Sequence, residues 1–358
     1  MLSSISQNKI TVLVYLRCAF HLTMYEKLFS ETHYDYVIVS DKISRDEMLT
    51  SSIAALPNCL FCTSIDQILY KLNAFGLFLT SDALATSAHK EALRLVLACH
   101  KAGIPVVELQ HGLFTYGDYY QCSCNNKMVQ PDGLPCRSFR DHLLSFSPNY
   151  AEDATCIGYP KYHSDCPPSY TGNYTLILSN LHWDAYTPLE RYAFMSSILH
   201  LANDYQNDLF VWRLHPGECA SFPGRNMLNS LFNIFPKAKN NILFTHENRI
   251  WSLISVDDII RKAGKIISTI STVILDCEMY NKKTMVYNAP SVRFAVERFK
   301  KVEKFCDYST LNRLWGDSDA VIETGMLYAW NKKKFEDFVE DKYKKPKDKY
   351  SVLDTIFS

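Results

Sequence analysis

The sequence predicts an α/β protein built from two doubly wound parallel sheets. Apolar runs of strand length alternate with segments of helical periodicity along most of the 358 residues. A chain of this length is too long for one ordinary hydrophobic core. A polar, Pro-containing segment over 164–173 separates two such series. We therefore expect domains at 1–165 and 166–358, and the possibility that the last helices return to the first domain stays open.

The first half has the shorter elements. Ser64 to Gln67 has the form of a helix-capping box, and Gly103 is expected to stop a helix. Strands are expected over 10–16, 34–40, 76–81, 104–109 and 143–147, with a short apolar run at 59–62. Helices are expected over 20–29, 46–55, 64–72 and 87–102.

The second half repeats the pattern with a longer first helix. Strands are expected over 174–179, 209–214, 242–245, 265–267 and 284–287. Helices are expected over 188–205, 226–235 and 256–261, in the amphipathic segment after Thr272, and over 292–302 and 326–339. Strands alternating with helices favour a parallel sheet in this half too.

Composition excludes several classes of function. Lys plus Arg and Asp plus Glu number 38 each, so no overall field draws the protein to nucleic acid. No apolar run reaches the length of a membrane span, and the N-terminus lacks the pattern of a signal peptide. We therefore expect a cytoplasmic protein whose twelve cysteines are reduced thiols, many of them in the core. The Lys-rich segment 342–349 is a solvated tail or, alternatively, a patch for peripheral contact with the inner membrane surface.

Polar residues at strand ends carry the functional hypothesis. Arg213 and His215 lie at the end of the strand over 209–214, and Pro216 and Gly217 then turn the chain. In open α/β sheets, ligands bind in the crevice at the carboxyl ends of the strands. Arg213 offers a planar fork of donors for phosphate, and His215 can donate to a phosphate or ribose oxygen. A surface histidine beside a turn is the alternative.

A second polar turn follows the strand over 265–267. Ser268, Ser271 and Thr272 lie between this strand and an amphipathic helix, and Ser271 or Thr272 is placed to cap that helix. The N-terminus of a helix attracts anions, so this turn and Arg213 together predict a phosphate cradle. Plain capping is the alternative. Asn180 and Asp184, which follow the strand over 174–179, are candidate contacts to a sugar.

The first half contributes a candidate base. Gln110, His111 and Gly112 follow the strand over 104–109, and a neutral imidazole at a strand tip can accept a proton from an attacking hydroxyl. A cap of the strand end is the alternative for His111. The long loop after it holds Tyr116 and Asp118, and Asp118 is the reserve base. Gln110, Gly112 and Tyr116 are further candidate sugar contacts. The cysteine spacing of this loop matches zinc sites poorly, so no metal is expected.

These motifs resemble those of GT-B bacterial surface-polysaccharide transferases. The segment from Gly103 to Gly112 resembles their strand followed by His-Gly, and Ile157-Gly-Tyr-Pro-Lys-Tyr162 resembles their Gly-x-Pro-Arg element. Arg213-Leu-His-Pro216 matches the Arg-x-His-Pro form of CDP-glycerol glycerophosphotransferases and the His-Pro motif of sialyl- and Kdo-transferases. The segment from Ser268 to Asp276 resembles their Ser/Thr-rich phosphate motif, and Asn281 then stands where a Gly is usual.

The resemblance implies two Rossmann-like domains facing a central cleft and an inverting transfer without a metal ion or other cofactor. His215, Ser271 and Thr272 would hold the phosphates, and Arg213 would support them or turn inward and hold its strand. His111 would deprotonate the acceptor hydroxyl. No acidic Asp-Gly motif precedes His111, which leaves an acid such as Asp118 as the other base.

The donor favoured is a CMP-activated acidic sugar such as sialic acid or Kdo. The acceptor would be a hydroxyl of a capsule, lipopolysaccharide or related glycan or glycolipid. Three alternatives stay open: a CDP-glycerol or polyol-phosphate transferase, a UDP-sugar 2-epimerase, and a non-catalytic binding subunit of the same fold.

Overall fold

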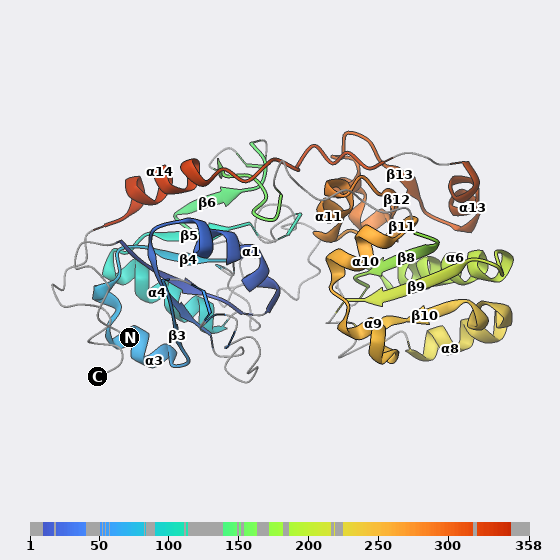
Figure 1. The fold of residues 1–358 in the computed structure, drawn as a ribbon, viewed down its shortest axis with the longest axis horizontal. Coiled ribbons are helices and arrows are strands. Elements are labelled where there is room, and N and C mark those ends of the chain that lie inside the picture. Colours follow the sequence, from blue (N-terminus) through green and yellow to red (C-terminus); the bar gives the residue numbers. More distant parts are fainter. Residues whose placement is uncertain are drawn as a thin grey trace. The chain divides into compact units, whose positions relative to one another are not determined.

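The computed structural model describes most of the chain. The described residues are 10–17, 19–40, 51, 53, 55–56, 58–81, 83, 90–110, 112–113, 139–148, 150–151, 154–162, 172–181, 186–215, 218, 225–317 and 321–344. The chain divides into two compact units, Met1–Ser164 with Tyr328–Ser358, and Asp165–Leu327. Each unit holds one parallel sheet with helices on both faces (Figure 1), which confirms the predicted fold class.

The first unit contains a seven-stranded sheet in the order β3-β2-β1-β4-β5-β6-β7. All of its strand pairs are parallel. The strands are β1 (Thr11–Tyr15), β2 (Asp35–Val39), β3 (Cys59–Cys62), β4 (Phe78–Thr80), β5 (Val106–Leu109), β6 (His142–Ser145) and β7 (Ala154–Cys156). The helices that connect them are α1 (Ala19–Glu31), α3 (Ile65–Tyr70) and α4 (Lys90–Ala102).

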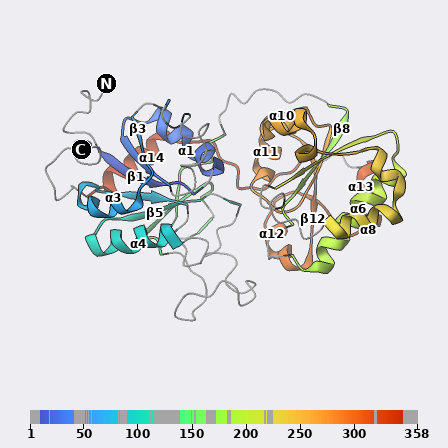
Figure 2. The same cartoon turned by 90° about the horizontal axis from the view of Figure 1, so that it is seen from below.

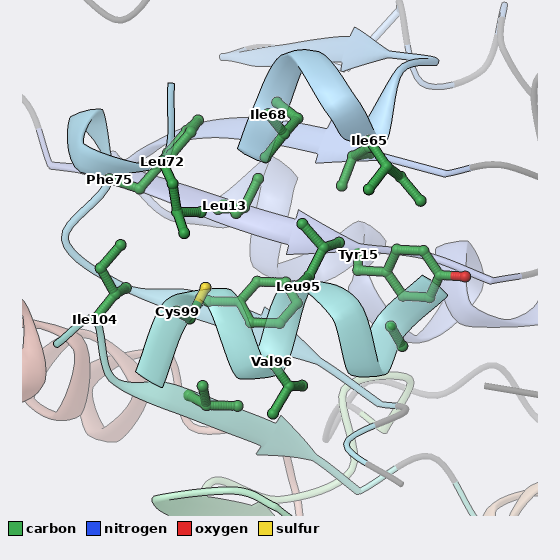
Figure 3. Close-up of a cluster of buried hydrophobic side chains, with 14 of the residues drawn as sticks. Leu13, Tyr15, Ile65, Ile68, Leu72, Phe75, Leu95, Val96, Cys99 and Ile104 are labelled. Atoms are coloured by element: carbon green, nitrogen blue, oxygen red, sulfur yellow. The ribbon is translucent and has the colours of Figure 1, made fainter. Parts of the chain in front are cut away.

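Alternating side chains of these strands face different helices, as the period of two in a strand requires. Leu13 and Tyr15 of β1 belong to a buried cluster with side chains of α3 and α4, among them Ile68 and Leu95 (Figure 3). On the other face, the Tyr36 ring of β2 packs edge-on against Phe29 of α1. Figure 2 shows α4 and α1 on opposite sides of this sheet.

The C-terminal segment belongs to the first unit. Helix α14 (Lys332–Lys342) packs the buried side chain of Phe335 against Tyr34, whose hydroxyl donates to Glu336 O at 3.1 Å. Before the helix, Tyr159 N donates to Tyr328 O at 2.8 Å and Asn331 N to Ile157 O at 2.8 Å. The chain therefore returns to the unit in which it starts.

The second unit contains a six-stranded parallel sheet in the order β10-β9-β8-β11-β12-β13. The strands are β8 (Tyr174–Ser179), β9 (Leu209–Leu214), β10 (Ile242–Phe244), β11 (Lys265–Ser268), β12 (Lys283–Tyr287) and β13 (Glu303–Phe305). The helices are α6 (Pro188–Asp204), α8 (Arg225–Ile234), α9 (Arg249–Leu253), α10 (Val256–Lys262), α11 (Val273–Met279), α12 (Arg293–Val296) and α13 (Tyr308–Asp317).

Helix α6 covers the face of the second sheet on which Trp212 lies. Its Phe194 ring contacts Trp212, Tyr287 and Phe305, which come from β9, β12 and β13. Thr187 and Glu190 form a complete capping box at its start. This face of the second sheet thus carries a cluster of buried aromatic rings beneath one long, well-capped helix.

Several boundaries differ from the sequence prediction. The expected helix over 326–339 begins only at Lys332, because residues 328–331 form backbone bonds to residues 157–162 instead. The expected helix over 292–302 is limited to Arg293–Val296, and β13 and α13 were not predicted. Part of the expected helix over 46–55 and most of the segment 164–173 lie outside the described residues. The predicted bond from Gln67 N to Ser64 Oγ is confirmed at 3.2 Å.

The structure bears on two expectations from the composition, the lack of a membrane-spanning helix and the reduced cysteines. Over the part of the chain that is described, no helix is both long enough and apolar enough to span a bilayer. Cys99 and Cys277 are buried free thiols, as predicted, and Cys306 is an exposed one.

Candidate functional site at the carboxyl edge of the second sheet

The order of strands in the second sheet creates a switch point between β8 and β11. From β8 the chain moves outward to β9 and β10, and from β11 it moves outward in the opposite direction to β12 and β13. The loops that leave β8 and β11 therefore diverge, and such a divergence is where doubly wound sheets bind ligands. Asn180 and Thr269 are the first residues beyond these two strands, and Asn180 N donates to Thr269 Oγ1 at 2.9 Å.

His215 lies at the same edge, directly after β9. Its backbone N–H is shared between Ser179 O at 3.1 Å and Glu218 Oε2 at 2.8 Å, whereas its side chain is exposed. Since β9 pairs with β8 over the full length of both strands, His215 is next to the β8 end of the switch point. In the structure, His215 thus has an exposed imidazole on a backbone whose N–H is held by two acceptors.

Arg213 belongs to the opposite face of β9 from Trp212. Its Nη1 donates to Ile254 O at 3.2 Å, in the turn between α9 and α10. Of the two roles considered for Arg213, this contact serves the second, in which the side chain holds its strand to a neighbouring loop.

The end of β11 and the turn after it hold two buried hydroxyl residues, Ser268 and Thr269, and two half-buried ones. Ser268 is fully buried, and its Oγ donates to Thr269 O at 2.8 Å, so it stabilises the turn from within. Ser271 and Thr272 are half-buried. Thr272 is the N-cap residue of α11, but its side chain does not form the expected cap. Ile274 N and Leu275 N instead bond to the carbonyl oxygens of Ser271 and Thr272. This tight first turn leaves the hydroxyl of Thr272 uninvolved in capping the helix.

Two buried residues of this edge were missed by sequence reasoning. Tyr186 is fully buried and its hydroxyl accepts from Ile270 N at 3.0 Å, which supports the turn after β11. Glu218 is fully buried and accepts from groups of both β8 and β9 loops. The only sequence signal for Glu218 is its spacing of three residues from His215, the spacing of a carboxylate that accepts from a backbone N–H.

In the first unit, Gln110 shapes the turn that follows β5. Its side chain is 1% exposed, its Oε1 accepts from Phe146 N at 2.7 Å, and its Nε2 donates to Gly112 O at 2.8 Å. The amide is thus engaged by backbone groups on both sides. Gln110 therefore ties the backbone at Gly112 to the backbone at Phe146.

Six predicted site residues lie outside the described residues: His111, Tyr116, Asp118, Asp184, Pro216 and Gly217. Their assigned roles stay predictions from the sequence. The structure brings together Asn180, His215, Ser271 and Thr272 at one edge of the second sheet, and it assigns Gln110 and Gly112 to the first unit.

The first sheet has its own switch point, between β1 and β4. Arg17 and His21 follow β1, and Arg17 N donates to His21 Nδ1 at 3.4 Å. The Tyr25 hydroxyl of α1 bonds to Ser81 Oγ at the end of β4, at 3.0 Å. The sequence analysis did not single out these residues, although Arg17 follows an apolar strand much as Arg213 ends one.

Comparison with known proteins supports the architecture. No family model matches the sequence, and no curated protein matches it. Among solved structures, UDP-GlcNAc 2-epimerase from Methanocaldococcus jannaschii is similar with a TM-score of 0.54 and 11% identity, over 93% of this chain and 99% of that chain. The Anabaena protein Alr3699/HepE, in complex with UDP and glucose, is similar with a TM-score of 0.55 and 9% identity, over 93% and 100%. The fold is GT-B-like. At this low identity, the likeness shows the fold, with its two Rossmann-like sheets, and nothing about specificity.

Proposed function

We propose that this chain is a glycosyltransferase that binds a nucleotide-activated sugar on its second unit. The observation that supports the proposal most is the group of Asn180, His215, Ser271 and Thr272 at the switch point of the second sheet. This is where doubly wound sheets bind nucleotides, and the group supplies an imidazole, an amide and two hydroxyls without a competing carboxylate among them. The similar Anabaena protein was solved with UDP and glucose, which agrees with such a ligand.

The chemistry follows from these side chains. The imidazole of His215 would donate to a phosphate oxygen, and the hydroxyls of Ser271 and Thr272 would add donors beside it. Negative charge grows on the leaving nucleotide as the glycosidic bond breaks, so donors aimed at the phosphates favour the transition state. The acceptor hydroxyl would lose its proton to His111, or to Asp118 as the second choice. Attack on the face opposite the nucleotide would invert the anomeric centre, with no metal required.

The donor we favour from the sequence motifs is a CMP-activated acidic sugar such as sialic acid or Kdo, and the acceptor is a hydroxyl of a bacterial surface glycan or glycolipid. A UDP-sugar 2-epimerase is the second candidate, because the epimerase from Methanocaldococcus jannaschii, also solved with UDP-GlcNAc and UDP, has the same architecture. A transfer of polyol phosphate from a CDP donor is the third.

A thermal-shift panel with CMP, CDP, UMP, UDP and GDP tests the proposal. A nucleotide at 100 times its dissociation constant stabilises the fold by about 2.7 kcal/mol, which is a shift of several degrees. We expect His215→Ala to abolish most of this shift, and His33→Ala, at an exposed histidine of the first unit, to retain it. Selective stabilisation by CMP supports the acidic-sugar donor, and CDP the polyol-phosphate reaction. A folded protein that no nucleotide stabilises contradicts the proposal and favours a non-catalytic binding subunit.

Product analysis separates transfer from epimerisation. Incubation with UDP-GlcNAc alone should yield a 2-epimer if the chain is an epimerase, whereas a transferase needs a glycan acceptor to consume its donor. Retention of turnover in EDTA is expected for the metal-independent mechanism.

A further inference from the structure

Glu218 is a buried carboxylate that the reaction scheme above does not use. Its side chain is fully buried four residues beyond β9. Its Oε2 accepts from Ser179 Oγ and from His215 N, each at 2.8 Å, and its Oε1 accepts from Leu181 N at 2.8 Å. One carboxylate thus bonds both to residues at the end of β8 and to the residue that follows β9.

These bonds continue into the core of the second unit. The fully buried Trp212 donates from Nε1 to Ser179 Oγ at 2.9 Å, and Ser179 Oγ in turn donates to Glu218 Oε2. Glu218 N also donates to His215 O at 2.8 Å, so the backbone of His215 is held at both its N–H and its carbonyl. An aromatic core residue and the exposed His215 are therefore joined through three consecutive hydrogen bonds.

Burying the carboxylate of Glu218 costs desolvation free energy, and filling space in the core would not require a charged group. Burial raises the pKa of Glu218, against the opposing effects of the hydrogen bonds from His215, Leu181 and Ser179 and of the Arg191 charge. A buried carboxylate is often no more stabilising than an apolar side chain of similar volume, because its desolvation offsets its interactions. What an apolar residue cannot do is fix the loops after β8 and β9 in one relative position. Costly polar groups that fix geometry are typical of binding sites.

We propose that Glu218 is a positioning residue of the nucleotide site, which sets the place of the His215 imidazole relative to the Asn180–Leu181 turn. The inference rests on the proposed function, because the ligand is the nucleotide whose phosphate His215 would contact. Loss of the carboxylate would allow the β9 loop to move relative to the β8 loop. Since a displacement of about 1 Å is enough to weaken a preorganised contact, affinity would fall although no direct contact is lost.

A double-mutant cycle tests this role. Dissociation constants are measured by calorimetry for the wild type, Glu218→Gln, His215→Ala and the double variant, with whichever of CMP, CDP, UMP, UDP and GDP binds the wild type most tightly. His215→Ala removes the imidazole and leaves the backbone N–H that bonds to Glu218. We expect Glu218→Gln to weaken binding roughly tenfold when His215 is present and less than twofold when it is absent, the coupling typical of residues that act together.

Equal losses in both backgrounds would overturn the proposal, because a general structural defect does not depend on the imidazole. If the wild type binds none of the five nucleotides, it is the proposed function that fails. Should Glu218→Gln not fold, Ser179→Ala replaces it in the same cycle, since it removes one donor to Glu218 and leaves the carboxylate in place. A smaller loss that again requires His215 is then expected.

Glu190 provides a matched control in the same unit. It is also a buried glutamate whose carboxylate accepts several hydrogen bonds, but its partners Thr187 and Ser291 lie at the N-terminus of α6 and after β12, not in the Asn180–Leu181 turn or at His215. Glu190→Gln should lower the free energy of unfolding and leave the dissociation constant of the nucleotide within twofold of wild type. If Glu190→Gln weakens binding as much as Glu218→Gln does, the effect is one of stability and the proposal is wrong.

Discussion

Gly158 and Ala329 are in direct backbone contact, although 171 positions separate them in the sequence. A Cβ atom built on Gly158 would lie 2.0 Å from Ala329 O, and Gly158 has a φ of +80°. Tyr159 and Ala329 form an isolated parallel bridge beside this contact. The Gly-x-Pro element that resembles the transferase motif is thus the place where the C-terminal segment joins the first unit, and both the space and the backbone conformation require glycine.

Gly158→Ala should therefore destabilise the first unit strongly. A left-handed backbone costs a residue with a Cβ about 1–2 kcal/mol, and the clash with Ala329 O adds to this, so we expect a loss of roughly 3 kcal/mol in urea unfolding. Gly103→Ala separates the two effects, because Gly103 has a φ of +72° but nothing within 4 Å of the added Cβ. It should show the smaller loss alone. Equal losses for the two variants would mean that the contact with Ala329 is unimportant.

Attachment of α14 should be a large part of the stability of the first unit. Phe335 is fully buried against Tyr34 and Trp330, and truncating a buried phenylalanine typically costs about 3–5 kcal/mol. We expect Phe335→Ala to lower the free energy of unfolding by that amount and to accelerate proteolysis within the first unit. Lys333→Ala, at an exposed position of the same helix, should have little effect. Protease resistance equal to wild type in Phe335→Ala would show that α14 is dispensable there.

The sequence predicted the carboxyl edge of the second sheet because strong local patterns create it. The strands β8, β9 and β11 are buried apolar runs, and the polar residues that follow them can only be at the strand ends. The directions of the side chains were harder to predict from the sequence. Arg213 bonds to Ile254 O, in the loop after α9, and this tertiary contact has no local signal in the sequence.

Other features were not predicted from the sequence, and the reasons are again specific to each segment. The strand Glu303–Phe305 has three residues, two of them charged, and it lies at the edge of its sheet, so its apolar pattern is too short to detect. The segment 326–331 has the spacing of a helix, but backbone pairing with residues 157–162 takes its hydrogen bonds. Glu218 was missed because its partners are two backbone N–H groups and one serine, none of which has a distinctive pattern.

Asn281 explains a departure from the resembling motif. It follows α11 with a φ of +50°, Asn281 N donates to Glu278 O at 3.0 Å, and Lys282 N donates to Cys277 O at 2.9 Å. This pair of bonds is the Schellman motif, in which the left-handed residue is usually glycine and sometimes asparagine. Asparagine therefore meets the same backbone requirement as the usual Gly.

Substitution at this position should follow the backbone requirement. Asn281→Gly is expected to retain or slightly raise stability, and Asn281→Ala to lower the free energy of unfolding by about 1 kcal/mol. Asn203→Ala, inside α6, should be neutral or stabilising because alanine favours helix. Thermal unfolding of the three variants measures this ranking. A variant Asn281→Ala as stable as Asn281→Gly would contradict the role assigned to the left-handed conformation.

Glu190 should make the second unit sensitive to acid. Burial tends to raise its pKa, but hydrogen bonds from Ser291 and Thr187 outweigh burial, so the pKa lies below the ordinary value of 4.5. A carboxylate with a lowered pKa in the folded state contributes stability that is complete above its unfolded pKa and is lost as the pH falls through the folded pKa. We expect Glu190→Gln to cost about 1–3 kcal/mol at pH 7, since an NH2 group replaces one of the two oxygens that accept from Thr187 and Ser291.

That cost should shrink with acidification. Urea unfolding of the wild type and Glu190→Gln between pH 7 and pH 3 gives the difference in the free energy of unfolding at each pH. The difference should be constant down to about pH 4.5, near the unfolded pKa, and then narrow as the wild type loses its charged acceptor. The exposed Glu297→Gln provides the control, with no comparable difference at any pH. A difference for Glu190→Gln that stays constant over the whole range would mean that shape rather than charge holds Thr187 and Ser291 together.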